Sequence, residues 1–221
     1  MPKDLAIVCS SGSLESLVAA GLAAQKYRLV LVHGVMHARE NRRLRQAYEL
    51  QVQHFKPLRE HTIDLTALEA IDVRRAGDHR PGADTANRLL ELFPMLSIAS
   101  RFAAHYQAAS IVMGLRTGPR GADLARATEF GQVMSELIQM PCGMLDCELQ
   151  LPIVDLEDWQ VADLAVQLQL PLDKSWSCDE DIPQPCGICA GCRRRDAAFV
   201  RAGRPDVEKK DAGRANMRMA T

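Results

Sequence analysis

The sequence has few aromatic residues, almost no net charge and no long apolar run, and each of these absences excludes a class of protein. Phenylalanine, tryptophan and tyrosine make up 5% of the 221 residues, and the formal net charge is −1. A charge this close to zero provides no overall attraction to nucleic acid or to an anionic membrane surface. No apolar run approaches the roughly 18 residues of a membrane-spanning helix. We therefore expect neither a membrane partner nor direct binding of nucleic acid.

The residues that are present are typical of a globular protein with a full core. Apolar residues make up 47% of the chain and charged residues 25%. The length fits one domain, or one domain with a small lobe. The first residues, Met1 to Asp4, lead directly into a strand-like run. We therefore expect no targeting peptide, a cytoplasmic location and reduced thiols.

Cysteine is scarce, and most of it lies in one short segment. Four of the seven cysteines fall within fifteen residues near the C-terminus, at Cys178, Cys186, Cys189 and Cys192. Four thiolates at this spacing can form a tetrahedral shell around Zn²⁺. Two disulfides are the alternative, but the two Cys-x2-Cys steps and the reducing location favour zinc. Four cysteines leave no open coordination position, so the spacing predicts a structural zinc site rather than a catalytic one.

Strand-like and helix-like segments alternate along the chain. The strand-like runs are short and apolar, and we place them at Leu5–Cys9, Arg28–Val35, Thr62–Leu65, Ser110–Gly114 and Glu148–Ile153. The helix-like stretches are Leu14–Lys26, Asn41–Phe55, Pro94–Gln107, Ala122–Met140, Val154–Gln169 and Ala190–Arg201, and a long loop spans 66–88. This alternation predicts an α/β fold in which helices cover both faces of a parallel sheet.

A serine-rich loop joins the first strand to the first helix. Its residues are Ser10, Ser11, Gly12, Ser13, Leu14, Glu15 and Ser16. In a parallel sheet, ligands collect beyond the carboxyl ends of the strands. Small residues and the N-terminus of the helix together favour an anion such as phosphate. The alternative is a helix capped by serine without any ligand, because serine is a common N-cap residue.

Several segments together resemble a known family. The loop from Ser11 to Ser16 resembles the Ser-Gly-Gly-x-Asp-Ser loop of the PP-loop ATP pyrophosphatases. With the segments 152–156, 170–178 and 185–195, the chain resembles the QueC branch, the 7-cyano-7-deazaguanine synthases. The resemblance implies the PP-loop fold of the adenine nucleotide alpha hydrolases. It also implies a nucleotide-binding domain over 1–170, a zinc-binding segment with a closing helix over 171–201, and a polar tail over 202–221.

The resemblance also implies a reaction and its ligands. QueC enzymes use ATP and Mg²⁺ to adenylate 7-carboxy-7-deazaguanine, and ammonia then gives the amide and, after a second adenylation, the nitrile. A protein or peptide amine is the other expected acceptor, in a phage-defence setting, and a homodimer is a further expectation. The implied ATP-binding residues are Ser10 to Ser16, and the implied deazaguanine-binding residues are Gly114, Arg116, Thr117 and Asp123. The implied zinc ligands are the four cysteines.

The chain departs from the family pattern at a few positions. Ser13 replaces a glycine, Glu15 replaces an aspartate, and Asp158 stands where the family has a lysine that neutralises phosphate. An Arg-Asn element is reduced to Phe93-Pro94-Met95-Leu96. An acid in place of a lysine is expected to reverse the local charge. A diverged protein that binds nucleotide, deazaguanine or a partner without turnover is therefore the alternative hypothesis.

Overall fold

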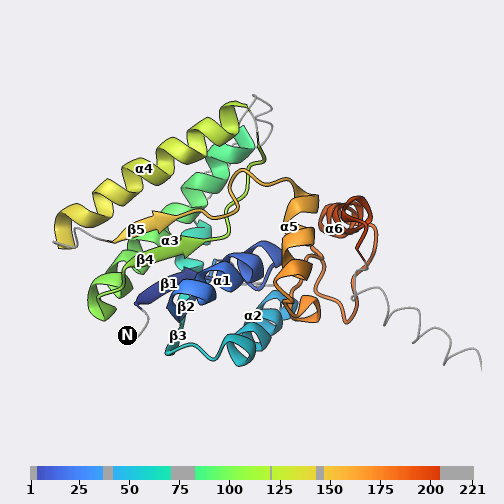
Figure 1. The fold of residues 1–221 in the computed structure, drawn as a ribbon, viewed down its shortest axis with the longest axis horizontal. Helices are drawn as coiled ribbons and strands as arrows, with labels where there is room; N and C mark the ends of the chain where they lie inside the picture. Colours follow the sequence, from blue (N-terminus) through green and yellow to red (C-terminus); the bar gives the residue numbers. More distant parts are fainter. Residues whose placement is uncertain (1–3, 37–41, 71–82, 120, 143–146, 205–221) are drawn as a thin grey trace, which may run out of the picture.

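A five-stranded parallel sheet forms the centre of the protein (Figure 1). The computed structural model describes residues 4–36, 42–70, 83–119, 121–142 and 147–204. The sheet order is β3-β2-β1-β4-β5, with strands β1 (Leu5–Cys9), β2 (Arg28–Val35), β3 (Arg59–Asp64), β4 (Ser110–Met113) and β5 (Glu148–Gln150). Ile7 of β1 lies opposite Val30 of β2 on one side and Ile111 of β4 on the other. The connections run outward in opposite directions from β1 and β4, so a crevice is expected where the carboxyl ends of these two strands meet.

Helices cover both faces of the sheet, because buried side chains alternate along each strand. Ile7, Val30 and Ile111 pack against α3 (Ala83–Tyr106) and α4 (Ala122–Cys142). Their neighbours Val8 and Leu31 point to the opposite face. There they pack against α1 (Leu14–Lys26) and α2 (Arg42–Phe55). The predicted α/β class with a parallel sheet is therefore confirmed.

The C-terminal part packs against α1 rather than against the sheet. It contains α5 (Asp158–Gln167), the short 3-10 helix η2 (Leu172–Lys174) and α6 (Ala190–Ala202). Leu17 and Val18 of α1 share one apolar cluster with Val161 of α5 and Phe199 of α6. Figure 1 shows α5 and α6 together at one end of the molecule. This arrangement carries the start of α6 toward the loop that precedes α1.

The largest difference from the predicted elements is in α3. A helix was predicted over Pro94–Gln107. The helix in fact begins at Ala83 and contains Pro94 in its interior. The earlier turns are stabilised by tertiary packing, since Leu89 and Leu92 contact the cluster formed by Leu115 of the loop after β4 and Ala127 of α4.

The other predicted elements agree in type; β1, α1 and β2 have the predicted ends, and the rest differ at one or both ends. The predicted helix over Val154–Gln169 begins only at Asp158, where Glu157 and Gln160 form a capping box. The predicted loop over 66–88 contains the 3-10 helix η1 (Thr66–Ala70) and the start of α3, while 71–82 lies outside the described residues. The predicted tail is described only to residue 204. Among the described residues, no helix combines the length and the apolar character that a membrane span requires.

Candidate functional site

The serine-rich loop is shaped by Gly12 and Ser13. Gly12 has a φ of +88°, and a Cβ atom there would overlap the carbonyl oxygen of Leu44 in α2. Ser13 is the N-cap of α1, and its Oγ accepts a hydrogen bond of 3.3 Å from the N–H of Ser16. Ser13 has ordinary extended backbone angles, so its side chain is accommodated without strain. The predicted N-cap is therefore present at Ser13. The cap leaves room for the other prediction, that the same loop binds a phosphate.

Hydroxyl groups converge above the start of α1. The Oγ of Ser11 donates to the Oγ of Ser13 at 3.1 Å, and the Oγ of Ser16 donates to the Ser13 carbonyl at 3.0 Å. Ser10 is buried, and its Oγ donates to Gln51 of α2 at 2.9 Å. The free N–H groups at the start of α1 add partial positive charge. The loop thus provides hydroxyl and amide donors at a position where an anion would be stabilised.

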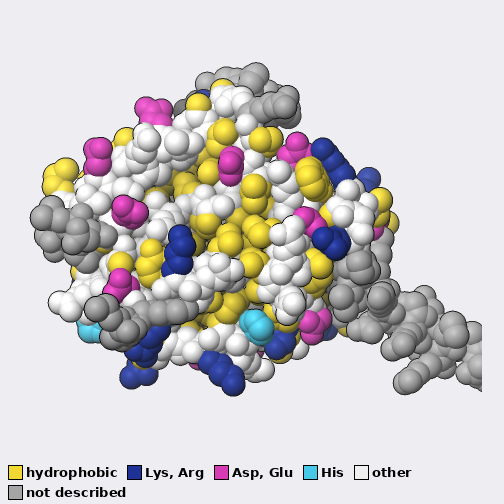
Figure 2. All heavy atoms as spheres, in the orientation of Figure 1, with side chains coloured by type: hydrophobic (Ala, Val, Ile, Leu, Met, Phe, Trp, Pro, Cys, Tyr) yellow, Lys and Arg dark blue, Asp and Glu magenta, His cyan; other side chains and the backbone are white. Residues whose placement is uncertain are grey.

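A cavity of about 740 Å³ lies beyond the carboxyl ends of β1, β2 and β4. Its polar wall includes Ser11, Ser13, Ser16, Arg116 and Arg194. Its apolar wall includes residues at the ends of β2 and β4 together with η1 and α3, among them Met36, Leu68, Leu90, Met95 and Met113. Figure 2 shows hydrophobic side chains gathered across the middle of the face seen in Figure 1. A cavity with one polar and one apolar wall suits a ligand that has an anionic group and a flat, uncharged ring.

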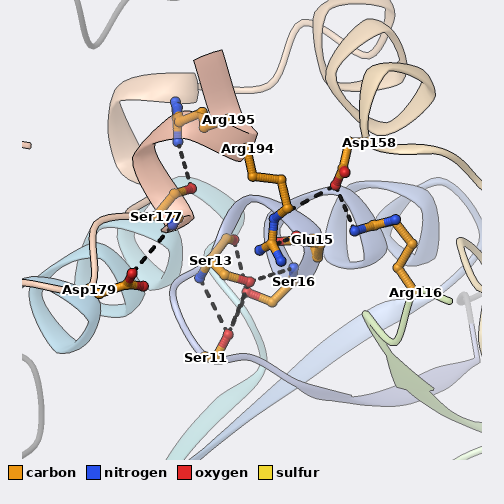
Figure 3. A network of polar contacts seen from close by, with 11 residues as sticks. Ser11, Ser13, Glu15, Ser16, Arg116, Asp158, Ser177, Asp179, Arg194 and Arg195 are labelled. Carbon is orange, nitrogen blue, oxygen red and sulfur yellow. Dashed lines mark hydrogen bonds and ion pairs between the residues drawn. The ribbon is translucent and has the colours of Figure 1, made fainter. Parts of the chain in front are cut away.

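Two arginines and two carboxylates form a chain of ion pairs along the polar wall (Figure 3). Arg116 Nη2 lies 2.6 Å from Asp158 Oδ1, while Arg194 Nε lies 3.7 Å from the same oxygen. Arg194 Nη2 also lies 3.3 Å from Glu15 Oε1. Asp158 was expected to reverse the local charge in place of a lysine. Two guanidinium groups face Asp158, so its charge is paired within the chain. The effect of this acid on a bound phosphate stays a prediction.

The four residues predicted to bind deazaguanine occupy different places. Gly114 and Arg116 line the cavity. A Cβ atom on Gly114 would come within 2.7 Å of the Glu15 carbonyl oxygen, so glycine allows β4 to meet the start of α1. Thr117 does not line the cavity, and its N–H and Oγ1 both bond the carbonyl of Val154. Asp123 also lies outside the lining, in the first turn of α4. A contact of Thr117 or Asp123 with a substrate stays a prediction.

The four cysteines of the C-terminal segment form one compact cluster. The Sγ atoms of Cys178, Cys186, Cys189 and Cys192 all lie within 4.8 Å of one another, and those of Cys178 and Cys189 are 3.8 Å apart. Zinc–sulfur bonds of 2.3 Å in a tetrahedron require sulfur separations of about 3.8 Å. The residues therefore fit a metal ion held by four thiolates.

Backbone amides point at these sulfurs and prepare them for a cation. The N–H of Cys189 bonds Cys186 Sγ at 3.3 Å, and that of Cys192 bonds Cys189 Sγ at 3.3 Å. Hydrogen bonds from the N–H groups of Ile188 and Cys189 lower the pKa of Cys186 to about 7. Burial raises the pKa of Cys178 and Cys192. A bound cation would offset that penalty by stabilising the thiolate form.

Three contacts that sequence patterns did not reveal hold the residues just before the cysteines: one to the serine-rich loop, one to α2 and one to α6. The N–H of Trp176 bonds the carbonyl of Gly12 at 3.0 Å. Gln51 is fully buried, and its Nε2 donates to the carbonyl of Lys174 at 2.9 Å. Arg195 is 6% exposed and donates to Ser175 Oγ at 3.0 Å. The first two contacts join segments far apart in the chain, so no local motif could have indicated them.

For the run Arg193 to Arg195, the sequence favours a solvated face by default and leaves contact with phosphate as the alternative. Arg193 is exposed, Arg194 lines the cavity, and Arg195 is buried behind the cysteine segment. The helical period of 3.6 residues explains the split, because three consecutive positions on a helix point in three directions.

A comparison with known protein families shows which family the chain belongs to. The family described as "Queuosine biosynthesis protein QueC" matches residues 5–203. The chain belongs to the QueC family. The match covers the sheet, the serine-rich loop and the cysteine segment together, as the resemblance predicted.

Relatives of this QueC family member have low sequence identity. A 7-cyano-7-deazaguanine synthase of Chloroherpeton thalassium is 27% identical over 220 residues, which cover 93% of this chain and 96% of that protein. One of Sulfolobus acidocaldarius is 27% identical and covers 95% of this chain, but the chain spans only 48% of that protein. A 4-thiouridine synthetase solved with RNA and ATP is similar with a TM-score of 0.54 at 16% identity, covering 95% of this chain and 53% of that one. That likeness supports the predicted fold.

Proposed function

We propose that this protein is an ATP-dependent carbon–nitrogen ligase that activates the carboxylate of 7-carboxy-7-deazaguanine. The observation that carries the proposal is the cavity at the meeting of β1 and β4, with the serine-rich loop on one side and an apolar wall on the other. The relatives are named 7-cyano-7-deazaguanine synthases, and a product of this kind supports a deazaguanine as the substrate. ATP would lie across Ser10 to Ser16, and Mg²⁺ would offset the negative charge of its phosphates.

The chemistry assigns two tasks to the site. A carboxylate oxygen of the substrate attacks the α-phosphorus of ATP, and pyrophosphate leaves. The nitrogen of an amine then attacks the acyl carbon, and AMP leaves as the nitrogen loses a proton. The hydroxyls and amides at the start of α1 would hold the phosphates, and the apolar wall near Met95 and Met113 would limit hydrolysis of the acyl adenylate by water.

We propose ammonia as the first amine, and a protein or peptide amine as the acceptor to test next. The first would give an amide and then a nitrile, while the second would suit a role in phage defence. The expected homodimer and the cytoplasmic location stay predictions. Zn²⁺ is the metal that we propose for the four cysteines, in a structural role, since four thiolates this close together would fill all four positions of a tetrahedral zinc site.

The test is an assay of products. The protein is incubated with ATP, Mg²⁺, 7-carboxy-7-deazaguanine and ammonium, and AMP and the deazaguanine products are measured by mass spectrometry. We expect AMP together with the amide or nitrile, and loss of both in Ser11→Ala. Absence of AMP with ammonia and with peptide amines alike would contradict the ligase proposal.

A second candidate function is binding without turnover. The absence of the expected lysine near Glu157 and Asp158 favours it. Calorimetry with 7-carboxy-7-deazaguanine distinguishes the two, because tight binding in a protein that forms no AMP would support this candidate. AMP formation that depends on Ser11 would exclude it.

A further inference from the structure

Arg194 differs from the other members of the ion-pair chain in how it is held. Its nitrogens lie 3.3 Å from Glu15 and 3.7 Å from Asp158, whereas Arg116 approaches Asp158 to 2.6 Å. The side chain of Arg194 is 44% exposed, and that of Arg116 is 14% exposed. Arg116 therefore provides the closer compensation of Asp158. Arg194 has weaker contacts and a guanidinium group with five N–H donors, so donors are available for a ligand.

The position of Arg194 points these donors at the serine-rich loop. The residue lines the cavity together with Ser11, Ser13 and Ser16. Figure 3 shows its side chain reaching from α6 to Glu15, beside Ser13 and Ser16. The chain of ion pairs has two positive and two negative members and therefore no net charge of its own. Glu69 and Glu91 also line the cavity. A polyphosphate would bring negative charge to this wall and compete with Glu15 for the guanidinium of Arg194.

The backbone beneath Arg194 is held firmly on both sides. Cys189 is the N-cap of α6, and its Sγ accepts from the N–H of Cys192. Arg195 donates to Ser175 and to the carbonyl of Leu172. The start of α6 is thereby fixed against the segment that also contacts Gly12 through Trp176. An anchored backbone with a loosely paired side chain lets the guanidinium change partners without movement of the helix.

We propose that Arg194 is a phosphate-binding residue, supplied by the helix of the cysteine segment to the nucleotide that occupies the cavity. Its guanidinium group rests on Glu15 in the free protein and donates to phosphate oxygens when a nucleoside triphosphate or pyrophosphate binds with Mg²⁺. The inference rests on the proposed function, because that function places a polyphosphate at the start of α1. The inference adds to that function a specific cationic side chain, Arg194, which comes from α6 and not from the serine-rich loop.

Calorimetry with two probes, Mg-ATP and Mg-pyrophosphate, tests the role of Arg194. We expect Arg194→Gln to weaken the binding of both probes by about tenfold, because it removes charge-assisted hydrogen bonds. Arg194→Lys should retain part of the affinity, and the dependence of affinity on salt concentration should be shallower in Arg194→Gln. Arg193→Gln is the matched control, since Arg193 is exposed on the same helix outside the cavity lining, and it should bind both probes as the unsubstituted protein does.

The outcomes separate the inference from the proposed function. If the unsubstituted protein binds neither probe, the proposed function fails and the inference fails with it. If the unsubstituted protein binds both and Arg194→Gln binds them equally well, the inference alone is overturned. Melting temperature and metal content are measured for each variant. A loss of either in Arg194→Gln would assign the residue to folding of the cysteine segment and would also overturn the inference.

Discussion

Single residues set the shape of the serine-rich loop, and Gly12 does so through its backbone. Its φ of +88° lies in the left-handed region, and the Leu44 carbonyl occupies the place where a Cβ atom would stand. Ser13, by contrast, has extended angles that any residue adopts. The change from glycine to serine at position 13 is therefore compatible with this loop, while a change at position 12 is not.

Gly12→Ala should lower the free energy of unfolding by at least about 1–3 kcal/mol, the usual cost of a side chain in a strained backbone conformation. The overlap with Leu44 adds to this cost. Gly118→Ala is the control, because Gly118 has a φ of +90° with nothing within 4 Å of its Cβ position. Urea unfolding of both variants isolates the steric part. Equal losses in the two variants would show that the contact with Leu44 is unimportant.

Cys9 ends β1 at the cavity, and burial raises the pKa of its thiol to about 12. The thiolate is the reactive form, so a raised pKa keeps the thiol protonated and unreactive at neutral pH and well above it. We expect iodoacetamide at pH 8 to label Cys9 slowly in the folded protein and rapidly in urea. Peptide mass spectrometry measures both rates. Rapid labelling of Cys9 in the folded protein would contradict this prediction.

At the scale of elements, α2 connects the loop before α1 to the segment that leads into the cysteines. Gln51 accepts a hydrogen bond from Ser10 and donates to the carbonyl of Lys174, and it is fully buried. A buried polar group that loses its partner costs about 1–3 kcal/mol. This amide, together with the hydrogen bond from the Trp176 N–H to the Gly12 carbonyl, aligns the loop with the C-terminal part.

Gln51→Leu should reduce the free energy of unfolding by about 1–3 kcal/mol, because it leaves Ser10 Oγ and the Lys174 carbonyl without this partner. Gln53→Leu, an exposed position on the same helix, should change it by no more than about 0.5 kcal/mol. Urea unfolding of the two variants gives the comparison. Similar small changes in both would show that Gln51 does not hold these segments together.

The second prediction at this scale concerns the cysteine segment. If its sulfurs hold one metal ion, the binding free energy contributes to folding of the segment, on the order of 10 kcal/mol in small zinc peptides. Cys189→Ser should lower bound zinc to well under one equivalent and reduce the melting temperature, as measured by elemental analysis and calorimetry. Cys9→Ser is the control and should keep its zinc. A purified protein without metal, or a stable Cys189→Ser variant, would contradict the prediction.

At the scale of the whole molecule, the nucleotide-binding part and the cysteine segment share a core. Phe199 of α6 is 1% exposed and packs with Leu17 and Val18 of α1, which also contact α5. The boundary at residue 170 between the nucleotide-binding domain and the zinc-binding segment stays a prediction. The shared apolar cluster indicates that the two parts stabilise each other, because either one alone would leave this cluster open to water.

Equilibrium unfolding should therefore follow one transition. Trp159 and Trp176 both belong to the C-terminal part, so tryptophan fluorescence reports on that part, while far-UV circular dichroism reports on all helices. The two curves should coincide in urea. Phe199→Ala should lower the midpoint of both by the same amount, with a cost of about 3–5 kcal/mol. An earlier fluorescence transition would show that the C-terminal part unfolds by itself.

Local patterns in the sequence determined the strands, most helices and the cysteine cluster. The first strand, first helix and second strand were predicted with their observed ends, because buried apolar runs, an N-cap serine and residue propensity all act within a few positions. The cysteine cluster was equally predictable, since its ligands lie within fifteen residues. The family followed from the order of these local motifs along the chain.

Only the tertiary structure decided the charge of the site. From the sequence, Asp158 is an acid where a lysine was expected. In the folded protein it faces Arg116 and Arg194, which lie 42 and 36 positions away. The extension of α3 before Pro94 was also decided by packing against distant residues. Electrostatic and packing energies depend on distances in space, and the sequence states only distances along the chain.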